Sequence, residues 1–158
     1  MAAAHDARDR FGRYLEEFAV GDVFRHWPGK TVTESEHHLF CCLTMAVSPI
    51  HTDAHYAEHE MASGRSLVVG TYIYALLLGM SVADTSGKAL AALGTRELRH
   101  VRPVHHGDTL YAESTVVEAR PSRSRPDAGV VTLETRGTNQ RGEVVCEFQR
   151  SFLVPRLP

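Results

Sequence analysis

The sequence predicts an α+β domain in which a curved antiparallel sheet wraps around one long buried helix. Helical spacing dominates the first half of the chain, β-branched and aromatic residues dominate the second half, and a continuous apolar segment at 67–82 lies between them. This segment does not alternate and carries bulky residues on every side, which predicts a helix that is buried all round. A sheet wrapped around this helix would supply the necessary cover.

The first half predicts a helix before this apolar segment. Thr33 and Glu36 stand in the capping-box relation, so the helix should begin near Glu34. Apolar residues then recur at helical spacing as far as Val47. Pro49 should end the helix, because proline disfavours helical geometry in the residue before it.

Strands are expected before and after the helices. A turn at 18–24 should lead into a first strand. Later segments rich in Val, Thr, Phe and Tyr predict extended structure at 98–104, 110–119, 130–136 and 144–154. The loop Asn139-Gln140-Arg141-Gly142 predicts a hairpin between the last two of these strands. The second half therefore predicts an antiparallel meander.

Length and charge limit the classes of function. A chain of 158 residues suits one domain, and we expect a loose lead-in at 1–13 and a single domain at 14–158. The formal net charge is -2, so the whole molecule attracts neither nucleic acid nor an anionic membrane. The cluster Arg120, Arg123 and Arg125 has two interpretations, a solvated loop, which we favour, or a phosphate contact.

Cysteine usage and the apolar segments indicate a cytoplasmic protein. The chain has three cysteines, an odd number, and Cys41 and Cys42 are adjacent, which is poor material for a disulfide framework. Both lie on an apolar-patterned helix without a basic neighbour, which predicts buried, unreactive thiols. The N-terminus lacks the apolar core of a signal peptide, and segment 67–82, interrupted by Gly70 and Gly79, is too short to span a bilayer.

The most informative motif is Ser48-Pro49-Ile50-His51-Thr52-Asp53-Ala54-His55-Tyr56-Ala57. Proline braces a turn that presents His51, and Asp53 then caps a short helix over 54–62, which Gly64 should close. Such a turn holds an imidazole in a fixed place at the mouth of a pocket. For Asp53 we favour capping over catalysis, because an N-cap carboxylate is engaged by backbone N–H groups.

Four motifs in a fixed order carry a family resemblance. They are Phe18-Ala19-Val20-Gly21-Asp22, Pro49-Ile50-His51-Thr52-Asp53, Val69-Gly70 and Arg102-Pro103-Val104-His105-His106-Gly107-Asp108-Thr109-Leu110. With this order and spacing, residues 14–155 resemble the MaoC-like dehydratase family of hot-dog-fold proteins. Arg25-His26-Trp27-Pro28-Gly29 and Asn139-Gln140 are most similar to the branch that handles itaconyl-CoA or mesaconyl-CoA type substrates. The resemblance implies a hot-dog fold and reversible addition of water to a 2-enoyl thioester, usually of coenzyme A.

The chain departs from the family's catalytic pattern, Asp-x-Asn-Pro-x-His. His51 and Pro49 match this pattern, whereas the aspartate position is Ala46 and the asparagine position is Ser48. A second acid–base group must therefore come from elsewhere, or the hydration chemistry is weakened or absent. Ser48 has two interpretations, a hydroxyl that positions water or a residue that stops a helix; a hydroxyl does not act as a general base near neutral pH.

The resemblance implies two catalytic roles. His51 would exchange protons with water and the α carbon, and Gly70 would present free N–H groups of the buried helix to the thioester oxygen. Glycine would also let the ligand approach closely. The alternatives are a loop-bonded histidine and a packing glycine. Glu36, His37 and His38 can approach the site from the preceding helix, but we favour a solvated helix start for them.

Further expectations concern the pocket and its partners. Ala46, Ile50 and Val69 would line the acyl pocket, and Arg99 and Arg102 at its rim are candidates for binding the coenzyme's phosphates. The exposed sheet edge of a single unit should join a second copy, so we expect a homodimer or a dimer-based assembly with the pocket between protomers. The expected ligand is an acyl thioester; no additional cofactor, metal, nucleic acid or membrane is expected.

Other functions remain open. The same fold would suit an acyl-CoA thioesterase, or a non-catalytic acyl-thioester binder or partner subunit that has lost its carboxylate. His55-Tyr56-Ala57-Glu58-His59 has the spacing of some zinc peptidases, but we favour two histidines on a polar surface helix because no convincing third ligand is evident. His105 and His106 precede a turn and are expected to face solvent.

Overall fold

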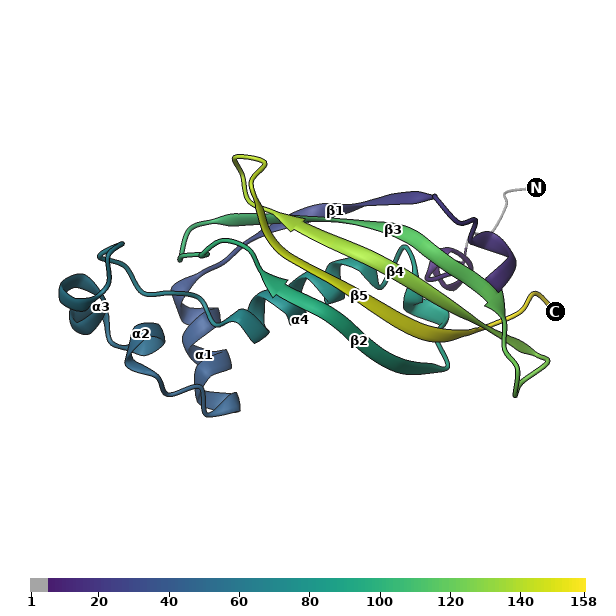
Figure 1. Ribbon diagram of the computed structural model, residues 1–158, viewed down its shortest axis with the longest axis horizontal. Helices are drawn as coiled ribbons and strands as arrows, with labels where there is room; N and C mark the ends of the chain where they lie inside the picture. The colour runs from purple at the N-terminus through teal and green to yellow at the C-terminus, as the bar shows by residue number, and fades with distance from the viewer. Residues whose placement is uncertain (1–5) are drawn as a thin grey trace.

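In the computed structural model, which describes residues 6–158, five antiparallel strands form one sheet that curves around a helix (Figure 1). The strands are β1 Val23–Thr31, β2 Ala91–His100, β3 Thr109–Pro121, β4 Ala128–Thr138 and β5 Val144–Pro155, in the order β1-β3-β4-β5-β2. The helices are α1 Glu34–Thr44, α2 Pro49–Thr52, α3 Ala54–Glu60 and α4 Gly70–Ser81. Three short 3₁₀ helices, η1 Ala7–Arg10, η2 Leu15–Glu17 and η3 Ser86–Lys88, complete the described part. The predicted α+β class is confirmed.

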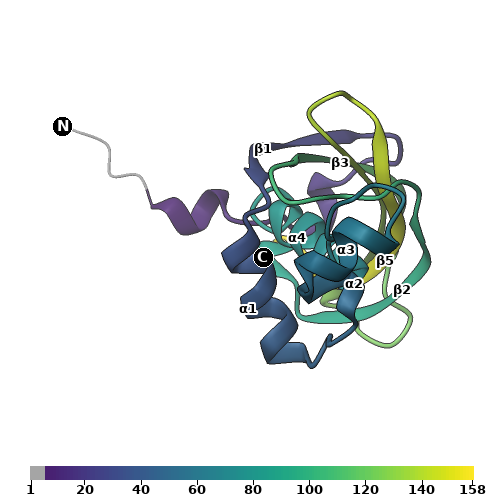
Figure 2. The same ribbon diagram turned by 90° about the vertical axis from the view of Figure 1, so that its left-hand side faces the viewer.

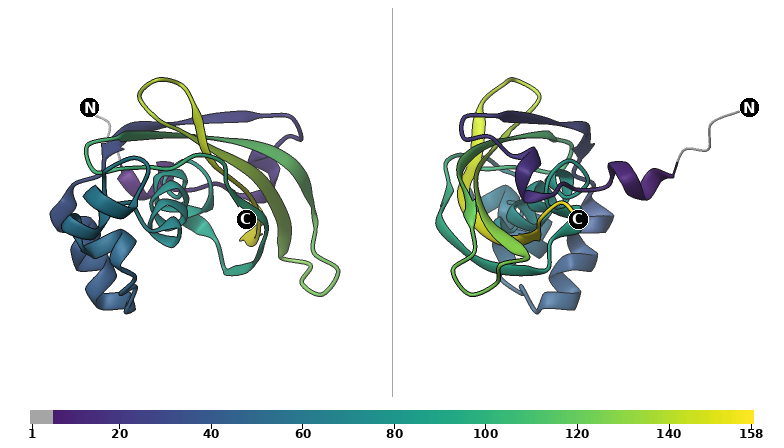
Figure 3. Two further views of the ribbon diagram at one scale, coloured as in Figure 1. Left: turned by 60° about the vertical axis from the view of Figure 1, so that its left-hand side comes forward. Right: turned by 90° about the vertical axis from the view of Figure 1, so that its right-hand side faces the viewer.

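Helix α4 lies in the hollow of the sheet (Figure 3). Its residues Ile73, Leu77 and Ser81 recur every four positions and are buried. Leu77 packs directly on β4, where a Cβ added to Gly137 would lie 2.3 Å from the Leu77 Cδ1 atom. The opposite face of α4 is exposed, so the prediction of a helix buried all round is wrong for a single chain. The reason is that the sheet curves around only one side of the helix.

Helices α1, α2 and α3 gather at the end of the sheet where α4 begins (Figure 2). Helix α1 starts as predicted, and Thr33 Oγ1 accepts a bond from the Glu36 N–H at 3.4 Å. The predicted end at Pro49 is wrong, because Met45 adopts a left-handed conformation with φ 57° and stops the helix at Thr44. Pro49 instead begins α2. Proline is tolerated at this position because an N–H in the first turn of a helix has no acceptor within the helix.

Helix α3 confirms the predicted short helix. Asp53 caps it, since its Oδ1 accepts the Tyr56 N–H at 2.9 Å. The helix ends at Glu60, slightly before the predicted position 62. Gly64 follows in a left-handed conformation with φ 62° and closes the segment.

The three C-terminal strands also agree with the sequence prediction. Strands β3, β4 and β5 pair consecutively as the predicted meander, and Asn139 and Glu143 are hydrogen-bonded across the predicted hairpin loop at 3.0 Å. Strand β2 differs, because it begins at Ala91 and ends at His100. Its first residues were missed since Ala-Ala-Leu-Gly-Thr has little β-propensity, and pairing with β5 imposes the extended conformation.

The predicted lead-in at 1–13 is only partly described, because residues 1–5 lie outside the described residues. Its last residues are attached to the segment after α4. The Gly12 N–H donates to the Ala83 carbonyl at 2.7 Å, and the Arg13 N–H donates to the Thr85 carbonyl at 3.0 Å.

Buried Arg150 ties the end of α4 to strand β5. Its Nη2 donates to Ser81 Oγ at 2.8 Å and to Thr85 Oγ1 at 3.1 Å. Burial lowers the pKa of Arg150 to about 10, because removal from water disfavours the charged form. Arg150 therefore helps to fix how far α4 extends along the sheet.

The cysteines are partly as predicted. Cys41 and Cys146 are buried, and burial raises the pKa of both thiols, that of Cys146 to about 11. Cys42 is exposed, so its predicted burial is wrong. The reason is that only one face of α1 turns toward the body of the protein. Between residues 6 and 158 no helix is long and apolar enough to cross a membrane.

The packing of α4 gives a stability test. We expect Leu77→Ala to lower the free energy of unfolding by about 2–5 kcal/mol, because it opens a cavity against β4. Leu43→Ala is the matched control, since Leu43 is 75% exposed and its truncation should cost less than about 0.5 kcal/mol. Urea unfolding measures the free energy of unfolding of both variants. Equal losses of stability in the two would contradict the packing described.

Candidate active site

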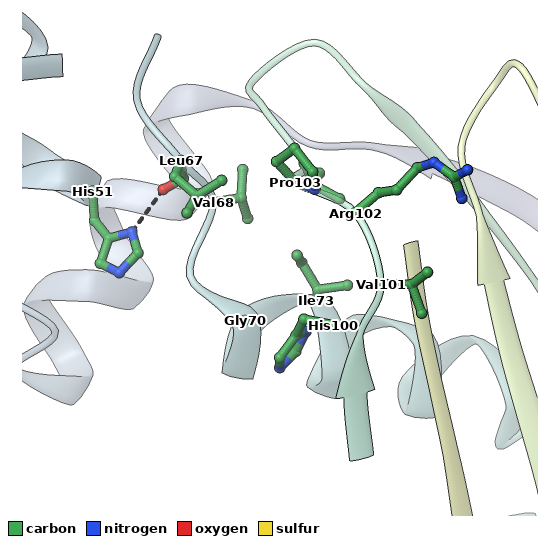
Figure 4. A pocket seen from close by; sticks show the side chains of 10 residues that line it. His51, Leu67, Val68, Gly70, Ile73, His100, Val101, Arg102 and Pro103 are labelled. Carbon is green, nitrogen blue, oxygen red and sulfur yellow. Dashed lines mark hydrogen bonds between the residues drawn. The ribbon is translucent and has the colours of Figure 1, made fainter. Parts of the chain in front are cut away.

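A pocket of about 330 Å³ opens at the N-terminal end of α4 (Figure 4). Its lining is mostly apolar and includes two imidazoles. The lining residues are His51, Leu67, Val68, Gly70, Ile73, His100, Val101, Arg102, Pro103 and Val104. Three separate parts of the chain therefore meet here: the end of α2, the start of α4 and the end of β2 with the segment after it.

The segment 67–70 is the centre of the site, because three different parts of the fold hold it. The Leu67 N–H donates to the Ile50 carbonyl at 2.9 Å, the Val68 N–H to the Val104 carbonyl at 2.9 Å, and the Val69 N–H to His37 Nε2 at 3.0 Å. The next N–H group, that of Gly70, has no hydrogen-bond acceptor within residues 6–158. A free N–H at the positive end of α4 is suited to accept developing negative charge on an oxygen.

His51 lies in the pocket with a defined tautomer. Its Nδ1 is 2.7 Å from the Leu67 carbonyl oxygen, as the dashed line in Figure 4 marks. A carbonyl can only accept, so Nδ1 carries the proton and the neutral ring keeps its lone pair on Nε2. The α2 turn and this bond fix the ring, which leaves Nε2 as its one site for proton exchange.

His37 supports the site from behind, which the sequence analysis missed. Its side chain is fully buried, so the favoured interpretation of a solvated helix start is wrong for this residue. Nε2 accepts the Val69 N–H, and therefore Nδ1 carries the proton and donates to His106 Nε2 at 2.8 Å. Burial, reinforced by neighbouring imidazoles, lowers the pKa of His37 to about 4. His37 is thus a neutral ring that fixes the peptide before Gly70.

His105 and His106 do not face solvent as expected. Both are half-buried, and His105 Nδ1 donates to the Ser66 carbonyl at 2.9 Å. Burial also lowers the pKa of His106, which keeps it a hydrogen-bond acceptor for His37. The turn that follows folds back onto the start of α1 and brings these rings inward.

His100 is the second imidazole in the pocket. Its ring lies against Gly70, since a Cβ added to Gly70 would be 2.6 Å from His100 Nε2. Packing against this ring is therefore one reason for glycine here, and close approach by the ligand stays a prediction. Glycine at position 70 makes room for the His100 ring, and the two groups share one wall of the pocket.

The structure brings together three of the predicted site residues, His51, Gly70 and Arg102. Figure 4 shows that the Arg102 side chain points away from the pocket, and its Nη1 donates to the Val144 carbonyl at 3.2 Å. The Arg99 guanidinium pairs with Glu147 at 3.2 Å, outside the lining residues.

The other predicted site residues lie nearby but do not line this pocket. They are Ala46, Ser48, Ile50 and Val69. Ser48 is exposed at the N-cap of α2, where its hydroxyl makes no capping bond. Val69 is buried, and its backbone serves the site by holding His37.

The zinc-like spacing on α3 does bring its side chains together. His55, Glu58 and His59 are all exposed, and their ligand atoms lie within 4.8 Å of one another. His59 Nδ1 donates to the His55 carbonyl at 2.8 Å. The cluster is separate from the pocket at α4, whose lining contains none of the three residues.

A hydrogen-bonded series of side chains outside this pocket has the residue types of a hydrolase triad. His26 lies 2.8 Å from Asp84 Oδ2 through Nδ1 and 2.9 Å from Ser114 Oγ through Nε2. Ser114 is fully buried, and its hydroxyl is also 2.9 Å from Thr135 Oγ1. Because the buried serine has no access to a substrate, these hydrogen bonds link β1, β3 and β4 and do not form an active site.

Comparison with known proteins places the chain in a family. A family model described as mesaconyl-CoA hydratase matches residues 2–158. The chain belongs to the mesaconyl-CoA hydratase family. Its resemblance to MaoC-like dehydratases is thereby confirmed.

Individual relatives of this family member differ in length. A mesaconyl-CoA hydratase of Haloarcula marismortui is 33% identical over 152 residues, which are 96% of this chain but 42% of the relative. The crystal structure of a MaoC-like dehydratase from Rhodospirillum rubrum matches with a TM-score of 0.79 and 33% identity, covering 93% of this chain and 99% of that one. A conserved hypothetical protein of Mycobacterium tuberculosis, described as a double hot-dog fold, matches with a TM-score of 0.75 and 25% identity; the match covers 93% of this chain and 45% of that one. The hot-dog fold is confirmed, and this chain spans about two fifths of the curated mesaconyl-CoA hydratase that it matches.

The neutral state of His37 gives a pH test. Its pKa is about 4 in the folded chain and about 6.5 when unfolded, so the unfolded state binds more protons between these values. Stability should therefore fall as pH drops from 6.5 to 4, by at most about 1.4 kcal/mol per pH unit from this group.

We expect His37→Gln to lose this part of the pH dependence, whereas His59→Gln, which changes an exposed imidazole, should keep it. Urea unfolding at several pH values compares the three proteins. If the free energy of unfolding changes with pH equally in the wild type and in His37→Gln, His37 is not held neutral.

Proposed function

We propose that this chain catalyses the reversible hydration of a 2-enoyl thioester of the coenzyme A type. The observation that carries the proposal is one pocket lined by both His51 and Gly70. Within residues 6–158, His51 Nε2 and the Gly70 N–H at the start of the helix have no hydrogen-bond partner. Membership in a family whose members are named hydratases supports the same reaction.

The two groups match the needs of the reaction. In the hydration direction, water adds its oxygen to the β carbon while His51 Nε2 takes a proton from it. The electrons of the double bond move toward the thioester oxygen, where the Gly70 N–H stabilises the enolate. The α carbon then receives a proton, and the carbonyl forms again. The largely apolar walls keep other water away from the enolate.

For the acyl group we propose a branched dicarboxylic chain of the mesaconyl type. The family match over residues 2–158 supports this choice. Arg102 remains the candidate for the phosphates of the coenzyme, because it is exposed and its one side-chain hydrogen bond within residues 6–158 goes to a backbone carbonyl. Arg99 is less suited, since Glu147 already neutralises its charge.

We propose further that two hot-dog units pair to complete the pocket. Every residue of β2 is exposed along one edge of the sheet, and the outer face of α4 is uncovered at Thr71, Ala75 and Gly79. An open edge with apolar residues such as Leu93 and Leu98 favours pairing with another strand. A second copy of this chain would cover both surfaces.

Two alternatives are tested by the same assay. A thioesterase would need a carboxylate beside the thioester, and within the described residues no Asp or Glu lines the pocket. A non-catalytic thioester binder would use the pocket without turnover. We therefore favour the hydratase over both.

The assay follows the enoyl absorbance and free thiol during incubation with crotonyl-CoA and mesaconyl-CoA. We expect the wild type to lose absorbance without releasing thiol, and His51→Ala to lower the rate by at least about 10²-fold. His59→Ala, on exposed α3, is the control and should retain activity. Thiol release would favour the thioesterase, and binding without either change would favour the binder.

The assembly has its own test. We expect the wild type to elute at twice the chain mass of 17.5 kDa in size-exclusion chromatography with light scattering. Ala75→Arg should shift it toward the single-chain mass, because it places a charge on the uncovered face of α4. Glu134→Arg, on an exposed position of β4, is the control. A wild type that stays at the single-chain mass at every concentration would contradict the pairing.

A further inference from the structure

We infer that His100 is the second acid–base group of this pocket and supplies the proton that the α carbon receives. This inference rests on the hydratase function proposed above. It identifies the group that substitutes for the carboxylate missing at position 46.

The first argument is the chemistry of the lining. Hydration requires one proton to leave water and one to reach carbon, at two different places on the substrate. Of the lining side chains in the described part of the chain, only His51, His100 and Arg102 can carry a proton. Arg102 points away, and a guanidinium does not give up its proton in a protein. His100 is the group that remains beside His51.

The second argument is position. His100 Nε2 and Cε1 would lie 2.6 Å and 2.8 Å from a Cβ on Gly70, so the ring touches the residue that offers the free N–H. A thioester oxygen bonded to that N–H places the carbonyl carbon next to it, and the α carbon is one bond further. In Figure 4 the start of α4 at Gly70 lies between the His51 and His100 side chains. His100 is therefore placed for the α carbon, and His51 for water at the β carbon.

The third argument is the freedom of the ring. His51 is bonded through Nδ1 to the Leu67 carbonyl, and His37 is bonded through both nitrogens. The His100 ring has no hydrogen-bond partner between residues 6 and 158, and the residue is exposed at the end of β2. An imidazole in this state can exchange protons with solvent and be reloaded after each turnover.

The step balances as follows. Water oxygen bonds to the β carbon, and its proton moves to His51 Nε2. The π electrons form the enolate at the Gly70 N–H, and the His100 imidazolium then gives its N–H proton to the α carbon as the carbonyl returns. One water has been added; His51 holds an extra proton and His100 lacks one, and exchange with solvent restores both. Dehydration runs through the same groups in reverse.

The competing role for His100 is packing, since its ring also fills the space beside Gly70. Two variants separate the roles. His100→Phe keeps an aromatic ring against Gly70 but cannot transfer a proton. His100→Ala opens a space at an exposed position, into which added imidazole can diffuse.

The experiment measures hydration of crotonyl-CoA and mesaconyl-CoA by the full chain. We expect both variants to lose about 10²- to 10⁴-fold in kcat with little change in KM, and added imidazole to restore part of the activity of His100→Ala only. His59→Ala with and without imidazole is the matched control. Retained kcat in His100→Phe, or no imidazole rescue of His100→Ala, would overturn the role of His100.

The outcomes also separate this inference from the proposed function. A wild type that hydrates, together with an inactive His51→Ala and a fully active His100→Phe, would overturn the inference and leave the hydratase function standing. A wild type that releases thiol or turns nothing over would overturn both.

Discussion

The site depends on one constraint, the way in which the peptide groups before α4 are held. The N–H groups of Leu67, Val68 and Val69, just before α4, each donate to a different part of the fold. The chain direction at Gly70 is therefore fixed before the helix begins. The next N–H, that of Gly70, has no acceptor within residues 6–158, and Gly70 lines the pocket.

The same segment sets the protonation of the imidazoles around it. The Leu67 carbonyl fixes the proton of His51 on Nδ1, and the Val69 N–H fixes the proton of His37 on the opposite side of its ring. A buried ring that must accept from a backbone N–H is only useful when neutral, which agrees with its lowered pKa. Within residues 6–158 the architecture thus provides one imidazole with an available lone pair, His51, one that is structural, His37, and one without a hydrogen-bond partner, His100.

The exposed surfaces of the chain are the basis for the proposed pairing of two units. Strand β2 carries His100 at its end and is open along one edge, while α4 carries Gly70 at its start and is uncovered on one face. Both elements that build the candidate site therefore border surfaces suited to a second hot-dog unit.

The sequence was sufficient for the main elements, because their signals are local. The cap at Thr33, the cap at Asp53 and the apolar run before Val82 fixed where helices form, and β-branched segments fixed three strands. The proline-braced turn and the family resemblance also named His51 and Gly70 as candidates, and both line the pocket. Where the sequence prediction failed, one local backbone conformation and one long-range strand pairing decided. The left-handed Met45 ended α1 early, and pairing with β5 extended β2.

The sequence by itself determined the fold class and the family, and it named His51 and the glycine at the start of α4 as candidates. Only the tertiary structure placed His37 behind that helix start and His100 beside Gly70, and it left Ala46 and Ser48 outside the pocket lining. The physical reason is that these contacts join residues thirty or more positions apart, such as His37 with Val69. No local pattern encodes them, because they arise when a curved sheet brings the end of one strand against the start of the helix it encloses.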